Sequence, residues 1–231
     1  QAEGADGAGD VNAQNVRAGT AGNEDMAADN AVQTENQTEN AAEDFTVQIP
    51  VAGEHMVYNA MAAAAVGEAL GLTAEQIKTG IEGMETIAGR NHIIRENGFL
   101  ILDDCYNANP VSMKAGIDVL SEVEGSRTVA IMGDMFELGD EEAQMHYEVG
   151  QYAARKGISL IISIGSLAQN YEKGIEEISR TGGYAGRHLY FADLDAFLET
   201  GIREIRKGDA VLVKASHAMH FEKIVKVLQE Q

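Results

Sequence analysis

Apolar and polar positions follow a regular pattern from Asn91 onward. Apolar runs of about four to eight residues alternate with longer stretches in which apolar residues recur at helical spacing. The runs predict buried strands, and the longer stretches predict amphipathic helices. We expect strands at 93–95, 99–102, 127–132, 159–164, 188–191 and 209–214. We expect helices at 111–123, 140–156, 166–180, 193–206 and 218–229.

Strands that alternate with helices of this length predict an α/β fold, a mostly parallel sheet with helices on both faces. The Asn97-Gly98 pair between the first two strands predicts a hairpin at the start of this sheet. Ligands of open α/β sheets bind at the carboxyl ends of the strands. The loops that follow the strands are therefore where we expect a functional site.

Residues 45–90 follow a different pattern. We expect a strand at 45–49, helices at 55–70 and 73–84, and a linker at 86–90. Thr73 and Gln76 have the spacing of a capping box at the start of the second helix. We therefore divide the chain into three parts, 1–44, 45–88 and 89–231.

The first 44 residues contain ten acidic residues and one basic residue, Arg17, and they contain no aromatic residue, Leu or Ile. Such a segment buries too little apolar surface to offset its conformational entropy, so we predict that it is disordered. It has neither the basic nor the apolar region of a signal peptide.

Charge and cysteine content narrow the functional classes. The chain has a formal net charge of −20, which disfavours a nucleic-acid surface because binding phosphates requires clustered Lys and Arg. Its one cysteine, Cys105, excludes an internal disulfide. Since no apolar run approaches the length of a membrane span, we expect a cytoplasmic protein without membrane insertion.

The turn at residues 103–110 combines two carboxylates, a phenol and two amides directly after a predicted strand. This density of polar groups favours a ligand site, while an Asx-rich turn that caps the next helix is the alternative. Cys105 lies beside the carboxylates, which should raise its pKa and make a nucleophilic role unfavourable.

Three further strand ends carry polar residues. In the loop at 133–139, Asp134 and Glu137 could orient a cation or an amine; the alternative is a plain loop with Asp140 as helix N-cap. Gly165 and Ser166 could offer free N–H groups to an anion, or form a simple turn. Lys214 could meet phosphate or carboxylate, or extend to solvent.

The histidines point less clearly to a site. His217 and His220 are three positions apart on a predicted helix, but without further ligands two surface histidines are the better interpretation, and we predict no metal site. We interpret His146 as a helix-surface residue. The chain has no Gly-x-x-x-x-Gly-Lys-Ser/Thr loop for nucleotide phosphates.

Several of these motifs occur in an order that resembles the Mur ligase family, in particular the members that add D-Ala-D-Ala. The motifs are Gly53–Ala60, Gly89-Arg90, Asp103–Pro110, Gly133–Gly139 and Val211–Ser216. The resemblance covers about residues 45–231. It implies that 45–88 is the end of a central ATPase domain, that 89–231 is the C-terminal Rossmann-like domain, and that the phosphate loop is missing.

The resemblance also implies an activity, an ATP-dependent carbon–nitrogen ligation through an acyl phosphate. ATP and Mg2+ would be the cofactors, with Mg2+ bound mainly by the absent part of the central domain. D-Ala-D-Ala and UDP-MurNAc-tripeptide would be the substrates in peptidoglycan synthesis. We expect this chain to be monomeric and inactive alone; a non-catalytic module that binds nucleotide or dipeptide is the alternative.

By this resemblance, each candidate residue has an implied role. Catalysis would involve Asp104 and Lys214. Nucleotide binding would involve Asn59, Arg90, Asp104 and Asn107. The substrate side would comprise Asn107, Asn109, Asp134, Glu137, Lys214 and Ser216. Two departures weaken this transfer, because the family usually has Asn at the position of Met56 and often has Arg at that of His217.

Overall fold

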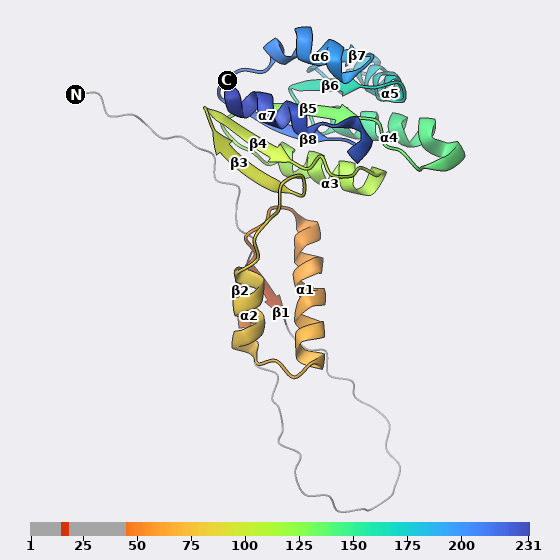
Figure 1. Ribbon diagram of the computed structural model, residues 1–231. Coiled ribbons are helices and arrows are strands. Elements are labelled where there is room, and N and C mark those ends of the chain that lie inside the picture. The colour runs from red at the N-terminus through yellow and green to blue at the C-terminus, as the bar shows by residue number, and fades with distance from the viewer. Residues whose placement is uncertain (1–14, 19–44) are drawn as a thin grey trace, which may run out of the picture. The chain divides into compact units, whose positions relative to one another are not determined.

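The computed structural model describes residues 15–18 and 45–231 (Figure 1). The chain forms two compact units. The described residues of the N-terminal unit are 15–18, 45–50 and 54–85, and those of the C-terminal unit are 51–53 and 86–231. None of the helices in these ranges has the length and apolar character needed to span a membrane.

In the N-terminal unit, two short strands accompany two helices. Strand β1 (Asn15–Ala18) pairs antiparallel with β2 (Phe45–Gln48), and helices α1 (Glu54–Ala69) and α2 (Ala74–Glu82) follow. The predicted capping box is confirmed, because the side chains of Thr73 and Gln76 each accept a hydrogen bond from the other's backbone N–H. Gly67 allows close packing of the helices, since a Cβ atom there would lie 2.8 Å from Ile77 Cγ1.

Most of the acidic segment 1–44, predicted to be disordered, lies outside the described residues. Residues 15–18 are the exception, and they form β1 where we predicted no strand. β1 pairs with β2 through backbone groups. A strand of four residues is too short for its pattern of apolar and polar side chains to predict this pairing.

The C-terminal unit contains the predicted mostly parallel sheet, with six strands in the order β3-β4-β8-β5-β6-β7 (Figure 1). The strands are β3 (His92–Glu96), β4 (Phe99–Asp103), β5 (Arg127–Gly133), β6 (Leu160–Ile164), β7 (Arg187–Phe191) and β8 (Asp209–Lys214). β3 and β4 form the predicted antiparallel hairpin, and the remaining neighbours pair in parallel. Asn97 and Gly98 both have positive φ, as the tight hairpin turn requires.

Five helices cover the two faces of this sheet, as predicted (Figure 1). They are α3 (Pro110–Ser121), α4 (Glu142–Arg155), α5 (Gln169–Arg180), α6 (Leu194–Thr200) and α7 (Glu222–Glu230). Strand β8 shows the alternation, because Leu212 belongs to the core with α3, α4 and α5, while Val211 and Val213 belong to the core with α6 and α7. Both faces are apolar, which explains the continuous apolar runs in the sequence.

Helices α4 and α5 approach each other closely at two glycines. A Cβ atom on Gly150 would overlap the backbone of Tyr171, and one on Gly174 would overlap the carbonyl oxygen of Tyr147. Backbone atoms have little freedom to move aside, so these contacts depend on the absence of side chains.

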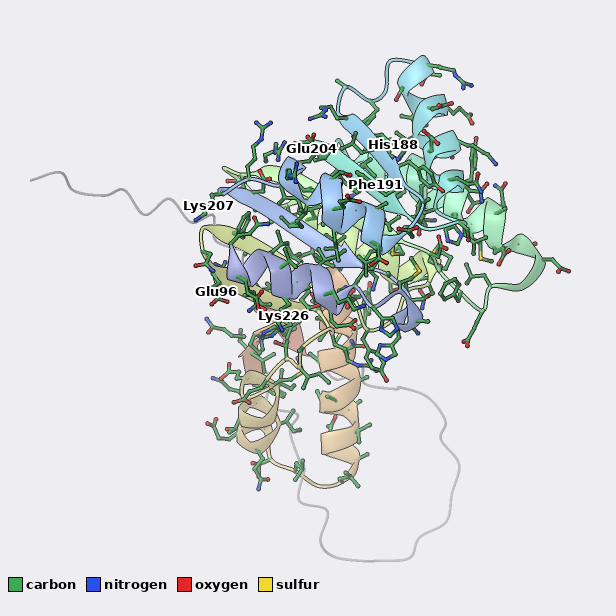
Figure 2. All side chains as sticks on the ribbon, turned by 45° about the horizontal axis from the view of Figure 1, so that its top comes forward. Glu96, His188, Phe191, Glu204, Lys207 and Lys226 are labelled. Atoms are coloured by element: carbon green, nitrogen blue, oxygen red, sulfur yellow. The ribbon has the colours of Figure 1, made fainter. Side chains whose placement is uncertain are left out.

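The edge of the sheet formed by β7 is visible in Figure 2, where His188 and Phe191 both lie on that strand. His188 is largely buried, and its Nε2 lies 2.9 Å from the hydroxyl of Ser163 on β6. The Phe191 ring packs edge-on against Phe197 of α6. Burial lowers the pKa of His188 to about 4, so this histidine is neutral near pH 7.

Two predicted helices begin differently from our expectation. Residues 139–141 form a 3-10 turn before α4, and Asp140 lies inside it, so its prediction as the helix N-cap is wrong. His217 begins another 3-10 turn, and His220 follows it with a left-handed backbone, so the two histidines do not lie on one regular helix, and their ring centroids are 6.5 Å apart.

Candidate functional site

The strand order brings the polar loops of the C-terminal unit to one edge of the sheet. Strands β4, β8, β5 and β6 are consecutive neighbours and run parallel, so their carboxyl ends lie side by side. The turn at 103–110 follows β4, residues 215–217 follow β8, the loop at 133–139 follows β5, and residues 165–168 follow β6.

Lys214 lies at the centre of the first of these loops. Its side chain is 1% exposed, so the alternative that it extends to solvent is wrong. Its ammonium group donates to Asp104 Oδ2 at 2.5 Å, to the Asn107 carbonyl at 2.9 Å and to the Asp104 carbonyl at 3.3 Å. A lysine has three N–H donors, so these three acceptors satisfy the buried charge.

The two carboxylates of the turn hold the first residues of the C-terminal unit. Asp103 accepts a hydrogen bond from the Gly89 N–H at 2.8 Å, and Asp104 Oδ1 accepts one from the Asn91 N–H at 3.0 Å. The Tyr106 N–H donates to the Gly89 carbonyl at 2.9 Å. Residues 89–91 are therefore fixed to the turn by backbone groups on both sides of Arg90.

The side chain of Arg90 is exposed beside this attachment. Its guanidinium carbon lies 3.8 Å from the centroid of the Tyr106 ring, a cation–π contact. The Tyr106 ring also contacts the His217 ring at a centroid distance of 5.2 Å. An exposed cation and two exposed rings thus gather at the end of β4 and β8.

Cys105 is buried beneath the turn. Its thiol donates a hydrogen bond to Asp103 Oδ1 at 3.1 Å. Burial, followed by the hydrogen bond and charge of Asp103, raises the pKa of the Cys105 thiol well above its usual range. The predicted direction is confirmed, and the thiol stays protonated near neutral pH.

Both asparagines of the turn form local backbone contacts. Asn109 caps helix α3, with its side chain accepting from the Ser112 N–H at 2.8 Å, so the helix-capping alternative holds for this residue. Asn107 Oδ1 accepts from the Ala108 N–H at 2.8 Å. Both side chains are exposed, and their predicted ligand contacts stay predictions.

In the second loop, Asp134 faces the protein interior. The residue is 2% exposed, and its carboxylate accepts from the Ala168 N–H at 2.7 Å and from the Ser166 hydroxyl at 3.4 Å. An N–H group at the start of α5, where an anion site and a plain turn were the two alternatives, therefore binds this carboxylate. Gly165 is required there, because a Cβ atom on it would overlap the carboxylate of Asp134.

Ser216 connects the loop after β8 to the loop after β5. Its N–H donates to the Asp134 carbonyl at 3.0 Å, and its hydroxyl accepts from the Phe136 N–H at 2.8 Å. Ser216 is 5% exposed, so its hydroxyl is engaged inside the protein. Phe136 and Glu137 are the exposed residues of this loop, and Glu137 has a left-handed backbone at φ 62°.

His146 is a functional candidate that sequence reasoning missed. Our interpretation of it as a helix-surface residue is wrong, because it is 0% exposed and its Nε2 accepts from the Met135 N–H at 2.9 Å. The apolar neighbours of α4 could have indicated burial, but no sequence pattern identifies the backbone group that this ring meets.

Asn59, the one predicted nucleotide contact outside the C-terminal unit, lies on α1. Its side chain is exposed, and its amide donates to the sulfur of Met56 at 3.4 Å. An Asn at position 56 would offer a stronger acceptor than a thioether.

Comparison with known proteins identifies the family. The domain family described as "Mur ligase, glutamate ligase domain" matches residues 89–217, which is more than half of the chain. This chain belongs to the Mur ligase family.

The chain is similar to individual Mur ligases in both sequence and fold. The chain is 38% identical over 219 residues to UDP-N-acetylmuramoyl-tripeptide–D-alanyl-D-alanine ligase of Escherichia coli strain K12, covering 91% of this chain and 46% of that protein. A crystal structure of MurF from Acinetobacter baumannii superposes with a TM-score of 0.72 at 32% identity, covering 81% and 40% of the two chains. MurF ligase from Thermotoga maritima, solved in complex with ADP, has a TM-score of 0.66 at 23% identity and supports the fold alone.

The alignment with the E. coli relative covers very different shares of the two proteins. The chain spans less than half the length of the E. coli relative. The alignment with this relative covers 91% of the present chain, which is more than residues 45–231 contain. The similarity therefore extends into the acidic segment 1–44, which we had placed outside the resemblance.

Proposed function

We propose that this chain provides the C-terminal part of the catalytic cleft of a MurF-type, ATP-dependent carbon–nitrogen ligase. The reaction would add D-Ala-D-Ala to UDP-MurNAc-tripeptide in the cytoplasm. The names of the E. coli and A. baumannii relatives support this assignment. The observation that carries it is that Arg90, Asn107 and Glu137 are exposed at the edge of the sheet where β3 begins and β4 and β5 end.

The residues at the end of β4 suit a nucleotide. When bound, ATP supplies the phosphoryl group that converts the substrate carboxylate into an acyl phosphate. Arg90 would offer its guanidinium to phosphate oxygens, which its planar group of donors matches well. Asp104 would accept donors of the nucleotide, because its side chain is 24% exposed and each oxygen accepts only one hydrogen bond within the protein. Asn107 would add an amide contact, and for Asn59 a nucleotide contact stays a prediction from the resemblance.

Lys214 acts through Asp104 in this proposal. Because its ammonium group is satisfied inside the turn, it pairs with the Asp104 carboxylate and fixes its direction. Lys214 would then not contact a ligand itself, and nucleotide and dipeptide would meet Asp104 and the exposed groups around it.

The loop after β5 would form the dipeptide side of the cleft. Glu137 is an exposed carboxylate that could accept the ammonium group of D-Ala-D-Ala, and Asn109 could contribute its amide. Asp134 and Ser216 would act by holding this loop, since their polar groups bind each other and the start of α5.

Mg2+ has no clear place on the described residues. No group of three or more His, Cys, Asp or Glu in this part of the chain could hold a metal ion. The sequence also contains no Gly-x-x-x-x-Gly-Lys-Ser/Thr phosphate loop, so we propose that this chain does not catalyse ligation alone.

An NMR titration of the chain with D-Ala-D-Ala tests this proposal, with L-Ala-L-Ala as the matched control. We expect shifts of the Asn107, Glu137 and His217 amides with the D,D-dipeptide and smaller shifts with the L,L-dipeptide. Glu137→Gln should weaken the response while the spectrum of the fold is kept. Equal responses to both dipeptides would argue against the proposal, and ATP-dependent ligation by the chain alone would contradict its incompleteness.

A further inference from the structure

We propose that His146 is a positioning residue, which in its neutral form fixes the loop at 133–139 and on protonation releases it at Met135. The ring is buried between helix α4, which carries it, and the loop after β5. Neither the family resemblance nor the proposed function uses this histidine.

The hydrogen bonds of the ring define one tautomer. Nδ1 lies 2.6 Å from the Glu142 carbonyl oxygen, which can only accept, so Nδ1 carries the proton. Nε2 lies 2.9 Å from the Met135 nitrogen, whose N–H can only donate, so Nε2 is unprotonated. Neutral histidine with a proton on Nδ1 satisfies both contacts.

Protonation breaks this arrangement at one defined place. In imidazolium both ring nitrogens are donors, so Nε2–H would face the Met135 N–H. Two donors at this distance repel each other, and the Met135 N–H would lose its acceptor in a buried site. The contact of Nδ1 with Glu142 would stay.

The charged and titratable groups around the ring come from three elements. Glu142 lies on α4 itself, and Asp134 lies on the loop. Tyr171 of α5 packs against the ring at a centroid distance of 4.9 Å. Burial lowers the pKa of His146, and the carbonyl and charge of Glu142 and the charge of Asp134 oppose this effect only partly. The ring is therefore neutral near pH 7, as the geometry requires.

The remaining contacts of the loop limit the release to its middle. The Tyr171 hydroxyl donates to the Gly133 carbonyl at 2.9 Å, and the Ser216 hydroxyl accepts from the Phe136 N–H. Neither contact titrates near neutral pH, since burial raises the pKa of Tyr171. Acid would thus free Met135, next to the exposed Phe136 and Glu137. Any effect on dipeptide binding through Glu137 rests on the proposed function, whereas the release itself does not.

NMR spectroscopy of the 231-residue chain tests the proposal. At about pH 7 the ring ¹⁵N shifts should identify the Nδ1–H tautomer. Hydrogen exchange of the Met135 amide, corrected for intrinsic rates, should become less protected between about pH 7 and pH 5, by up to about twentyfold, because opening allows the ring to take up a proton. The reverse tautomer would overturn the proposal.

Two substitutions separate positioning from packing. His146→Gln keeps an acceptor that does not titrate, so protection of Met135 should persist and should no longer change between these pH values. His146→Leu removes the acceptor, so protection should be low at both. His188→Gln is the control, since it replaces the other buried neutral histidine and should leave the Met135 response as in the unchanged protein.

Each outcome of these experiments either supports or contradicts the proposed role of His146. Unchanged pH dependence in His146→Gln, or full protection of Met135 in His146→Leu, would overturn the proposal. If His146→Leu does not fold, the tautomer and the His146→Gln comparison still test it. Because none of these measurements uses a nucleotide or dipeptide, failure of the proposed function would leave their outcome unchanged.

Discussion

The turn after β4 and the loop after β5 are both rich in acidic residues, but they are held in place in different ways. The turn at 103–110 is fixed by a buried cation, since the ammonium group of Lys214 binds Asp104 and two backbone carbonyls. The loop at 133–139 is fixed by neutral groups, the His146 ring and the hydroxyls of Ser216 and Tyr171.

This difference separates the roles of two acidic residues that look alike in the sequence. Asp104 pairs with a cation and remains partly exposed, so it can also meet a ligand. Asp134 binds the backbone at the start of α5 and is closed off from solvent. An acidic residue at a strand end can thus stay partly open to solvent or be closed off as a structural cap, depending on which donors its neighbours supply.

The largest effect should come from Gly174→Ala, which removes the support of the loop by forcing α4 and α5 apart. The new Cβ atom would meet the Tyr147 carbonyl, and we expect a loss of about 4 kcal/mol in the free energy of unfolding or failure to fold. Urea denaturation measures it. Gly80→Ala, where nothing lies within 4 Å, is the control and should be neutral or slightly stabilising. Equal stability of the two variants would refute the close packing.

Lys214→Met tests the charged anchor of the turn. Removing the ammonium group leaves Asp104 and two carbonyls without their donor, so we expect the free energy of unfolding to fall by about 3 to 4 kcal/mol. The fall should lie toward the lower value, because Asp104 is partly exposed to solvent. Adding Asp104→Asn should recover part of this loss, because the uncompensated charge is then gone. A double variant whose losses simply add would mean that the two side chains are not coupled.

Acid should lower the free energy of unfolding through His188, the largely buried histidine on β7. Because burial lowers the pKa of His188 to about 4, the unfolded chain binds a proton near about pH 6.5 while the folded protein does not. The contribution of the neutral ring is complete above about pH 6.5 and is lost as the pH falls toward 4, by at most about 3 kcal/mol. Denaturation at several pH values should show a shallower loss for His188→Gln, and parallel pH profiles would exclude this origin.

The smallest effect concerns the exposed contact between Arg90 and Tyr106. Tyr106→Ala removes the ring beneath the guanidinium, and we expect a loss below about 1 kcal/mol together with greater mobility of the Arg90 side chain in NMR relaxation. Tyr106→Phe keeps the ring and should keep Arg90 ordered. If both variants leave Arg90 equally ordered, then other groups position it.

The sequence predicted the fold well because the relevant signals are local. The apolar runs of β5, β6 and β8 and the Asn97-Gly98 hairpin are readable from neighbouring residues. Helix starts were less accurate. Asp140 lies in a 3-10 turn, because the left-handed backbone at Glu137 and Gly139 changes how the chain enters α4.

The candidate site was predicted only as a set of loops. Asp104, Asn107 and Lys214 were all selected, and the structure brings them into direct contact. The burial of His146, and the occupation of the α5 start by Asp134, were not foreseen. Both findings depend on contacts between groups far apart in the sequence, and a periodic pattern of neighbouring residues does not predict such contacts.

The sequence by itself thus determined the α/β class, the positions of the strand-end loops and the resemblance to Mur ligases, because periodicity and motif spacing act over a few residues. The tertiary structure decided which polar side chains face outward. Lys214, Asp134, Ser216 and His146 are turned inward by partners on other strands and helices, and buried polar groups must find such partners. Arg90, Asn107, Phe136 and Glu137 are exposed instead.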